Sequence, residues 1–179
     1  RVLFRSNQEH ESYLMKITYE IFDKKDDITG KPLIDVILDR AKQKGTGKWS
    51  VQDALDLGVP IPTINAGVND RNLSALKGER REIAQILGGL EDEKVEDREQ
   101  FLQNLEEALY VSIVIAYAEG MKLLQVASEE YDYNLNFSEI ARIWEDGCII
   151  RSSLLKPIQQ AYQQHDDLVN LIISSQFKD

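Results

Sequence analysis

The residues of this chain best suited to chemistry are a run of glycines, cations and a hydroxyl, Lys44-Gly45-Thr46-Gly47-Lys48-Trp49-Ser50, with Arg71 farther on. Glycine lets the backbone approach a bound group closely. A hydroxyl, ammonium groups and the free amides of a helix start suit a phosphate dianion. Ser50 and Asp53 form a capping-box pattern, which predicts that a helix begins at Ser50. A ligand-free helix entry with solvated lysines fits the same run, so the residues alone leave both interpretations open.

Two common nucleotide-binding motifs do not fit this run. A Walker A loop has the form G-x-x-x-x-G-K-S/T, but Trp49 follows Gly47-Lys48 and Lys42 occupies the place of the first glycine. A dinucleotide fingerprint, G-x-G-x-x-G, would need a glycine where this chain has Ser50. The run is therefore not typical of a nucleotide-binding loop, and we expect no coenzyme-binding residue in it.

Composition and charge narrow the class of protein. The chain has 179 residues, of which 42% are hydrophobic and 29% charged, as is ordinary for one soluble globular domain. Its formal net charge of -10 argues against a nucleic-acid partner, and we find no run of about 18 apolar residues that would indicate a membrane partner. The single Cys148 fits a reducing compartment, so we expect a cytoplasmic protein. His10 and His165 each lack a second ligand at metal spacing, so we expect no metal site.

Apolar residues recur at helical spacing along almost the whole chain and predict an all-α fold. From residue 95 to 131 the sequence has no proline and a single glycine, Gly120, so we expect one long central helix. Its middle is apolar nearly all round, which predicts burial on most sides between Phe101 and Leu124. We also expect Trp49 and Trp144 in the core. Shorter helices are predicted over 8–23, 33–44, 50–57, 63–76, a span ending at 88–89, 137–144, 152–162 and 168–173.

Three longer blocks resemble the 6-phosphogluconate dehydrogenase family, the decarboxylating enzymes of the pentose phosphate pathway. They are KGTGKWSVQDALDLGVPIPTINAGVNDR (44–71), ALYVSIVIAYAEGMKLL (108–124) and ARIWEDGCIIRSSLLKPI (141–158), in the family's order. The resemblance implies that residues 8–179 form a single helical domain like the family's carboxy-terminal domain. We expect residues 1–7 to be a non-native or disordered start. The family's Rossmann domain and its arginine-bearing tail would lie before and after this chain.

The resemblance also implies an activity and a set of binding residues. Members of the family oxidise 6-phosphogluconate with NADP, decarboxylate the keto intermediate to ribulose 5-phosphate, and work as homodimers. In this chain Lys44, Thr46 and Arg71 fall where the family binds the substrate phosphate. No catalytic and no coenzyme-binding residue of the family falls within the chain, so we expect the chain alone to be inactive.

The chain departs from the family at a few positions. Asn69-Asp70 precede Arg71 where members carry Phe-Ala, and Asp70 adds a carboxylate on a different face of the helix. Ile113 and Glu119 replace Lys and Gln, which we interpret as packing or surface changes. The alternative to an enzyme domain is a non-catalytic helical dimerisation or interaction module, whose KGTGKW run only starts a helix. A G-x-G-x-x-G upstream in the parent gene would favour the enzyme, and its absence would favour the module.

Overall fold

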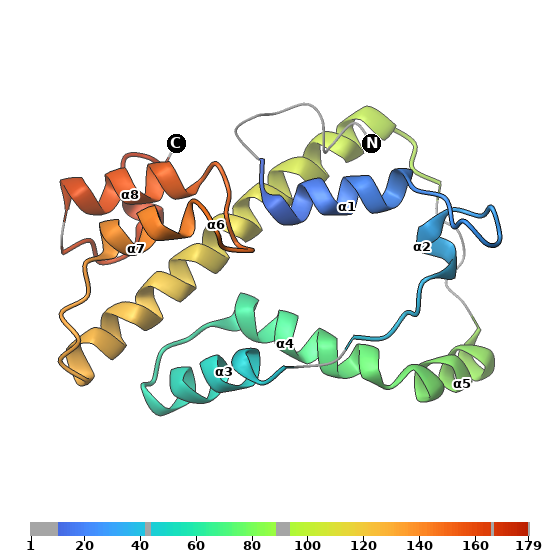
Figure 1. Ribbon diagram of the computed structural model, residues 1–179, viewed down its shortest axis with the longest axis horizontal. Coiled ribbons are helices and arrows are strands. Elements are labelled where there is room, and N and C mark those ends of the chain that lie inside the picture. The colour runs from blue at the N-terminus through green and yellow to red at the C-terminus, as the bar shows by residue number, and fades with distance from the viewer. Residues whose placement is uncertain (1–10, 42–43, 89–93, 166, 179) are drawn as a thin grey trace.

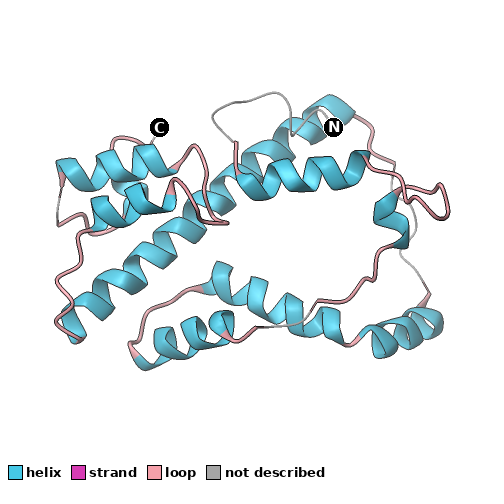
Figure 2. Ribbon diagram, viewed as in Figure 1, coloured by secondary structure: helices cyan, strands magenta, loops and turns pink. Residues whose placement is uncertain are grey.

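The computed structural model describes residues 11–41, 44–88, 94–165 and 167–178, and these residues form helices and loops without a strand (Figure 1, Figure 2). The prediction of an all-α fold is confirmed. The predicted start at residues 1–7 lies outside the described residues. The elements are α1 (Tyr13–Asp23), α2 (Leu33–Val36), α3 (Thr46–Asp56), α4 (Pro62–Ala75), α5 (Lys77–Leu87), α6 (Arg98–Glu130), α7 (Phe137–Trp144), α8 (Leu155–Gln164) and the 3-10 helix η2 (Leu171–Ile173).

The longest element, α6, runs diagonally through the molecule and has other helices on either side (Figure 1). It spans 33 residues, close to the predicted 95–131, because no proline interrupts it. Asp97 caps its start, since the side chain accepts a hydrogen bond from the Gln100 amide at 3.0 Å. The prediction of one long central helix is confirmed.

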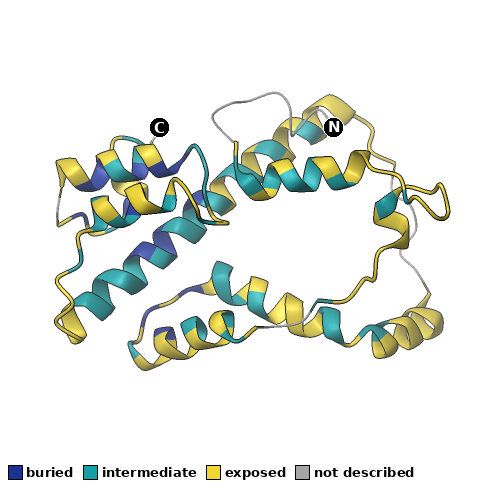
Figure 3. Cartoon of the chain, in the orientation of Figure 1, coloured by how far each residue is buried: buried dark blue, intermediate teal, exposed yellow. Residues whose placement is uncertain are grey.

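The larger core lies where α7, α8 and η2 pack on the carboxy-terminal half of α6. We call α1, α6, α7, α8 and η2 the body. Four large side chains in this core are fully buried: Met121, Leu155, Ile158 and Leu171. The buried residues gather on α6 and α8 (Figure 3). Helix α1 joins the body through backbone hydrogen bonds, from the Tyr13 amide to the Arg151 carbonyl at 3.1 Å and from the Ser153 amide to the Glu11 carbonyl at 2.8 Å.

A second and much smaller core lies among the remaining helices, α2 to α5, which we call the arm. Of the arm residues that the structure describes, Ala54, Val59 and Ile61 are the buried ones, and Leu123 and Val126 of α6 pack against them. Helix α5 is exposed along most of its length (Figure 3). The arm therefore depends on α6 for part of its apolar cover.

The prediction that residues 101–124 are buried on most sides is wrong for the single chain. On α6 only Val114, Ala118, Glu119 and Met121 are buried. Phe101, Leu105 and Val111 are 49%, 44% and 52% exposed. The cause is the position of the neighbours, since α4, α7, α8 and η2 cover the middle and the end of α6, whereas in the described part of the chain α1 covers only one side of its first half.

Helix α6 also meets a membrane-span criterion of length and composition. An 18-residue window within it has a mean hydropathy of 1.3, and 22% of that window is buried. The expectation that no segment would be so apolar is therefore wrong. In the fold, however, apolar side chains of the same helix form part of the body's core, which accounts for its apolar character. The helix also binds the arm through the buried carboxylate of Glu119.

Helix α2 is much shorter than the predicted helix over 33–44. It ends at Val36 because Ile37 is extended, with φ -64° and ψ 153°. Beyond it, the Ala41 amide donates a hydrogen bond to the hydroxyl of Ser74 on α4 at 2.9 Å. A bond to a residue so far along the chain draws this segment away from helical geometry, and local sequence gives no sign of it.

Candidate functional site

Helix α3 begins earlier than the capping-box pattern predicts. Gly45 is its N-cap, at φ 109°, and the helix starts at Thr46 without a side-chain cap. Ser50 lies inside the helix, where its hydroxyl donates to the Thr46 carbonyl at 3.0 Å, so the prediction that Ser50 starts the helix is wrong. Because φ values near 109° are open to glycine and rarely to other residues, Gly45 alone permits this start. The Thr46 hydroxyl thereby comes into the first turn of α3, with Lys44 just before the cap.

This end of α3 carries a group of hydrogen-bond donors. The first amide with a partner in the helical pattern is that of Trp49, which donates to the Gly45 carbonyl at 3.0 Å. The amides of Thr46, Gly47 and Lys48 precede it and have no acceptor within the helix. The helix dipole adds positive potential at the same end. Since the side chains of Lys44, Thr46 and Lys48 are exposed, an anion could reach these donors.

Trp49 covers a glycine and is not a core residue. Its side chain is 61% exposed, so the prediction of a core tryptophan is wrong there, whereas Trp144 is half-buried and packs against the body's core without being part of its buried set. A Cβ atom on Gly45 would lie 3.4 Å from the Trp49 ring. The physical reason is that α3 buries only the face of Ala54, which is 2% exposed, and Trp49 lies on another face.

Helices α3 and α4 form an antiparallel pair in which α4 continues past the start of α3 (Figure 1). The two helices approach closely at Gly47, where a Cβ atom would lie 3.1 Å from Cγ2 of Val68. Arg71 follows Val68 by one helical turn, and residues three apart share a helix face. Arg71 therefore lies on the part of α4 that extends beyond the start of α3, at the same end of the pair as Lys44.

The structure thus brings the segments of all three predicted residues to one end of the α3–α4 pair, and all three side chains are exposed. The convergence of their charged tips on one anion stays a prediction. Lys48, interpreted from the sequence as solvated, is exposed in the first turn of α3.

A carboxylate that the sequence analysis treated as a packing or surface change holds the other end of α4. Glu119 is 8% exposed, and its two oxygens accept hydrogen bonds from the amides of Thr63 and Ile64, each at 2.9 Å. Pro62 occupies the first turn and Ile61, the N-cap, provides no side-chain cap. A charged group on α6 therefore caps α4 from outside. No sequence pattern signals this role, since 55 residues separate Glu119 from Ile64.

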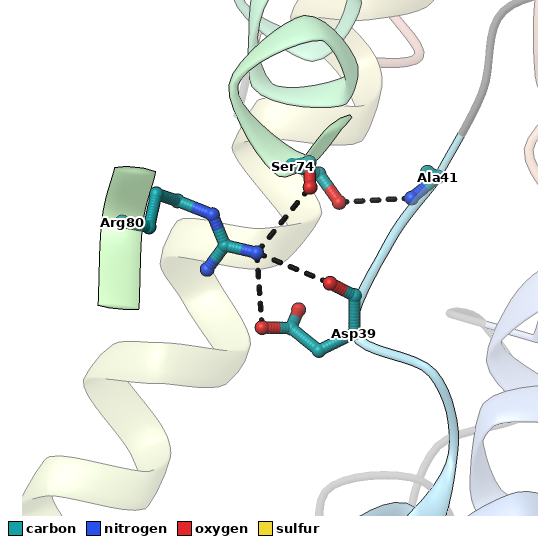
Figure 4. Close-up of polar contacts among 4 residues, drawn as sticks. All are labelled: Asp39, Ala41, Ser74 and Arg80. Carbon is teal, nitrogen blue, oxygen red and sulfur yellow. Dashed lines mark hydrogen bonds and ion pairs between the residues drawn. The ribbon is translucent and has the colours of Figure 1, made fainter. Parts of the chain in front are cut away.

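A guanidinium group holds the carboxy-terminal end of α4 (Figure 4). Nη2 of Arg80 donates to the carboxylate of Asp39 at 3.0 Å, to the carbonyl of Asp39 at 3.1 Å and to the carbonyl of Ser74 at 3.3 Å. No local sequence pattern indicates this cluster either, because Asp39 and Arg80 are 41 residues apart.

The body has polar clusters of its own, away from the predicted residues. The Tyr117 hydroxyl donates to the Ile150 carbonyl and lies 2.9 Å from the Ser152 hydroxyl, and burial raises the pKa of Tyr117. The Arg151 guanidinium lies 3.7 Å from the centre of the Tyr13 ring. These contacts fix α1 and the loop before α8 on α6. Among the residues that the structure describes, no three His, Cys, Asp or Glu side chains are grouped as a metal ion would require.

Comparison with known proteins decides the family. The family model of the 6-phosphogluconate dehydrogenase C-terminal domain matches residues 3–179. The chain belongs to the 6-phosphogluconate dehydrogenase family. Its resemblance to that family, seen from three sequence blocks, is confirmed.

Individual members of the 6-phosphogluconate dehydrogenase family match over nearly the whole chain. The Bacillus subtilis (strain 168) protein named 6-phosphogluconate dehydrogenase, NADP(+)-dependent, decarboxylating, is 48% identical over 171 residues, which is 95% of this chain and 36% of the relative. A decarboxylating 6-phosphogluconate dehydrogenase of Synechococcus elongatus is 49% identical over 172 residues, again 95% of this chain and 36% of the relative.

A solved 6-phosphogluconate dehydrogenase has the same fold. The structure is that of the Plasmodium falciparum enzyme, described in its apo form and in complex with its cofactor NADP+ and its substrate 6-phosphogluconate. It matches with a TM-score of 0.90 and 38% identity over 99% of this chain and 38% of that chain. The chain therefore spans between 36% and 38% of the length of these relatives.

Proposed function

We propose that this chain is the substrate-binding and dimerisation domain of a decarboxylating 6-phosphogluconate dehydrogenase, and that Lys44, Thr46 and Arg71 bind the phosphate of 6-phosphogluconate. One observation carries the proposal. Gly45, at φ 109°, opens α3 at Thr46, and α4 carries Arg71 past that same end of α3. Family membership supports the substrate, since the relatives' names and the Plasmodium falciparum complex specify it.

Each group in the proposed site has a separate physical task. The Lys44 ammonium supplies a compact positive charge, and the Arg71 guanidinium offers a planar fork that matches two phosphate oxygens. The Thr46 hydroxyl and the first amides of α3 donate further hydrogen bonds along the helix dipole. The phosphate is remote from the carbons that react, so these bonds hold the substrate in position for hydride transfer and decarboxylation elsewhere in the enzyme.

We assign no catalytic and no coenzyme-binding residue to this chain. The proposed whole enzyme uses NADP, which the name of the Bacillus subtilis relative specifies, and forms ribulose 5-phosphate, CO2 and NADPH in the cytoplasm. The chain's part in that reaction is to recognise the anionic end of the substrate. On its own the chain should bind 6-phosphogluconate with a Kd on the order of millimolar, without turnover.

The proposed dimerisation rests on the exposed apolar residues of the body and the arm. Phe101, Leu105 and Val111 on α6 are about half exposed, and Ile86 and Leu87 on α5 are 75% and 79% exposed. A two-fold partner would cover such side chains, and closed two-fold pairs are the commonest assembly of identical chains. Light scattering of the purified protein at micromolar concentration should give twice the chain mass, and a monomer mass with an intact fold would contradict this.

The phosphate site is tested by kinetics of the full-length protein that carries this sequence. Arg71→Ala removes charge-assisted bonds of about 1.5–3 kcal/mol each, which corresponds to a rise in KM for 6-phosphogluconate of roughly ten- to a hundredfold. Lys44→Ala should act in the same direction. Lys48→Ala is the matched control, because it removes the same charge from the same helix end outside the proposed set. Equal effects of Lys44→Ala and Lys48→Ala would mean that the lysines act only through the general positive potential of this helix end, and would contradict a specific role of Lys44.

A further inference from the structure

The cluster around Arg80 joins three segments of the arm that are distant in sequence (Figure 4). Arg80 lies on α5, Asp39 lies in the segment before α3, and Ser74 lies in the last turn of α4. Nη2 of Arg80 bonds to both of the other segments, within 3.0–3.3 Å. The Ser74 hydroxyl completes the cluster by accepting a hydrogen bond from the Ala41 amide at 2.9 Å.

Two of these segments also carry the proposed phosphate ligands. Lys44 follows Ala41 by three residues, a stretch that spans at most about 11 Å. Arg71 precedes Ser74 by three residues on α4, so the two side chains share a face of the helix about one turn apart. The face of α4 that bears Arg71 is therefore the face to which Ser74 binds the chain that leads to Lys44.

The strength of the cluster comes mainly from its backbone contacts. The Asp39 side chain is 66% exposed, and an ion pair at such exposure contributes little. The two carbonyl contacts of Arg80 remain when that ion pair is weakened by solvent. A guanidinium is also favourable beside the last carbonyls of α4, which have no partner within the helix. Removing Arg80 should therefore release the segment more than removing the Asp39 carboxylate would.

We propose that Arg80 is a positioning residue of the phosphate site: it fixes Asp39, five residues before Lys44, against the end of α4, so that Lys44 and Arg71 meet the same phosphate. Arg80 itself makes no contact with the substrate in this proposal. The inference rests on the proposed function and adds a residue to it. Since the phosphate interaction is the same in the bound substrate and in the transition state, its loss should raise KM and leave kcat nearly unchanged.

The test measures kcat and KM for 6-phosphogluconate in the full-length protein that carries this sequence. Arg80→Ala should raise KM about three- to tenfold with kcat within about twofold, and Asp39→Ala should raise KM less. Arg81→Ala is the matched control, because Arg81 is exposed on the same turn of α5 and its loss changes the net charge equally. It should leave both constants unchanged.

The other possible results distinguish the positioning role of Arg80 from a structural role and from the phosphate site itself. A purely structural role would lower the folded fraction, which lowers the apparent kcat and leaves KM unchanged, and that result would overturn the inference. If Arg80→Ala does not fold, Ser74→Ala replaces it, since it removes only the acceptor of the Ala41 amide, and an unchanged KM there overturns the inference. An unchanged KM in Arg71→Ala would contradict the proposed phosphate site itself. A raised KM in Arg71→Ala together with an unchanged KM in Arg80→Ala would contradict only the positioning role of Arg80.

Discussion

Leu155 on α8 and Leu55 on α3 carry the same side chain in two very different surroundings. Leu155, in the body, is 0% exposed, whereas Leu55, in the arm, is 76% exposed. The body buries large apolar side chains from α6, α8 and η2 in one core. Among the described residues, the arm buries three small or medium side chains, against which Leu123 and Val126 of α6 pack, and polar contacts from Glu119 and Arg80 also hold it.

The difference assigns stability and binding to separate regions. Few buried apolar contacts and exposed backbone mark a region of low local stability, from which binding segments are commonly drawn. The proposed phosphate residues all lie in the arm or at its start. The arm's conformation then depends strongly on a few directional bonds, each of which a single substitution can remove.

The largest effect should come from the body's core. Leu155→Ala removes a fully buried side chain and leaves a cavity, so the free energy of unfolding should fall by about 2–5 kcal/mol. Leu55→Ala makes the same chemical change at an exposed position and should alter stability by less than about 0.5 kcal/mol. Urea denaturation monitored by circular dichroism measures both. Similar losses of stability in the two variants would contradict the difference in packing between body and arm.

The next effect tests the contact between the two regions. Glu119→Ala leaves the Thr63 and Ile64 amides without their acceptor, and unfolding free energy should fall by about 2–3 kcal/mol. Glu119→Gln keeps one acceptor oxygen and should lose about half as much. Hydrogen exchange of the two amides should quicken in both variants. Glu130→Ala, on the exposed end of α6, is the control, and unaltered exchange in Glu119→Ala would refute the cap.

A smaller effect tests the start of α3 within the arm. Gly45→Ala forces a side chain into φ 109° and toward the Trp49 ring, which should destabilise by about 1–2 kcal/mol. Gly67→Ala is a matched change inside α4, where no atom lies within 4 Å of the added Cβ, and it should stabilise by about 0.5–1 kcal/mol. Effects of the same sign at the two positions, measured by chemical denaturation, would count against the assigned α3 start.

The smallest effect at neutral pH concerns Tyr162 in the body. Burial raises the pKa of this residue from 10.0 to about 12. A raised pKa in the folded state means that its stabilisation is complete below pH 10 and is lost as pH rises toward about 12. Tyr162→Phe should therefore lose less stability than the wild type between those pH values. Tyr133→Phe, at a position 59% exposed, should follow the wild-type curve.

Elements governed by local sequence were predictable. Helix α6 was expected over 95–131 and spans Arg98–Glu130, and α4 was expected over 63–76 and spans Pro62–Ala75. The length of α6 follows from apolar spacing and the absence of proline, and the start of α4 follows from Pro62 in its first turn, all of which act within a few residues. The three proposed phosphate residues came from resemblance to a family, since their types alone also fit a ligand-free helix entry.

Features set by distant contacts were not predictable. The early end of α2 follows a bond from Ala41 to Ser74, and the role of Glu119 depends on α4, which is distant in sequence. The start of α3 was misplaced because side-chain capping was assumed where Gly45 caps with its backbone. Trp49 was placed in the core because size alone favours burial, yet α4 covers a different face of α3.

The carboxylate that binds α4 has a mechanical consequence. Glu119 holds α4 at Thr63 and Ile64, and Arg71 lies about 12 Å farther along the helix, from a rise of 1.5 Å per residue. Helix α4 is thus attached to α6 near its start, and a tilt of about 5° about this attachment would move the backbone of Arg71 by about 1 Å. A displacement of that size is enough to break a hydrogen bond between Arg71 and the phosphate. A single hydrogen bond would let α4 rotate about that bond. Because Glu119 binds two successive amides, its second oxygen prevents this rotation and so fixes the position of Arg71.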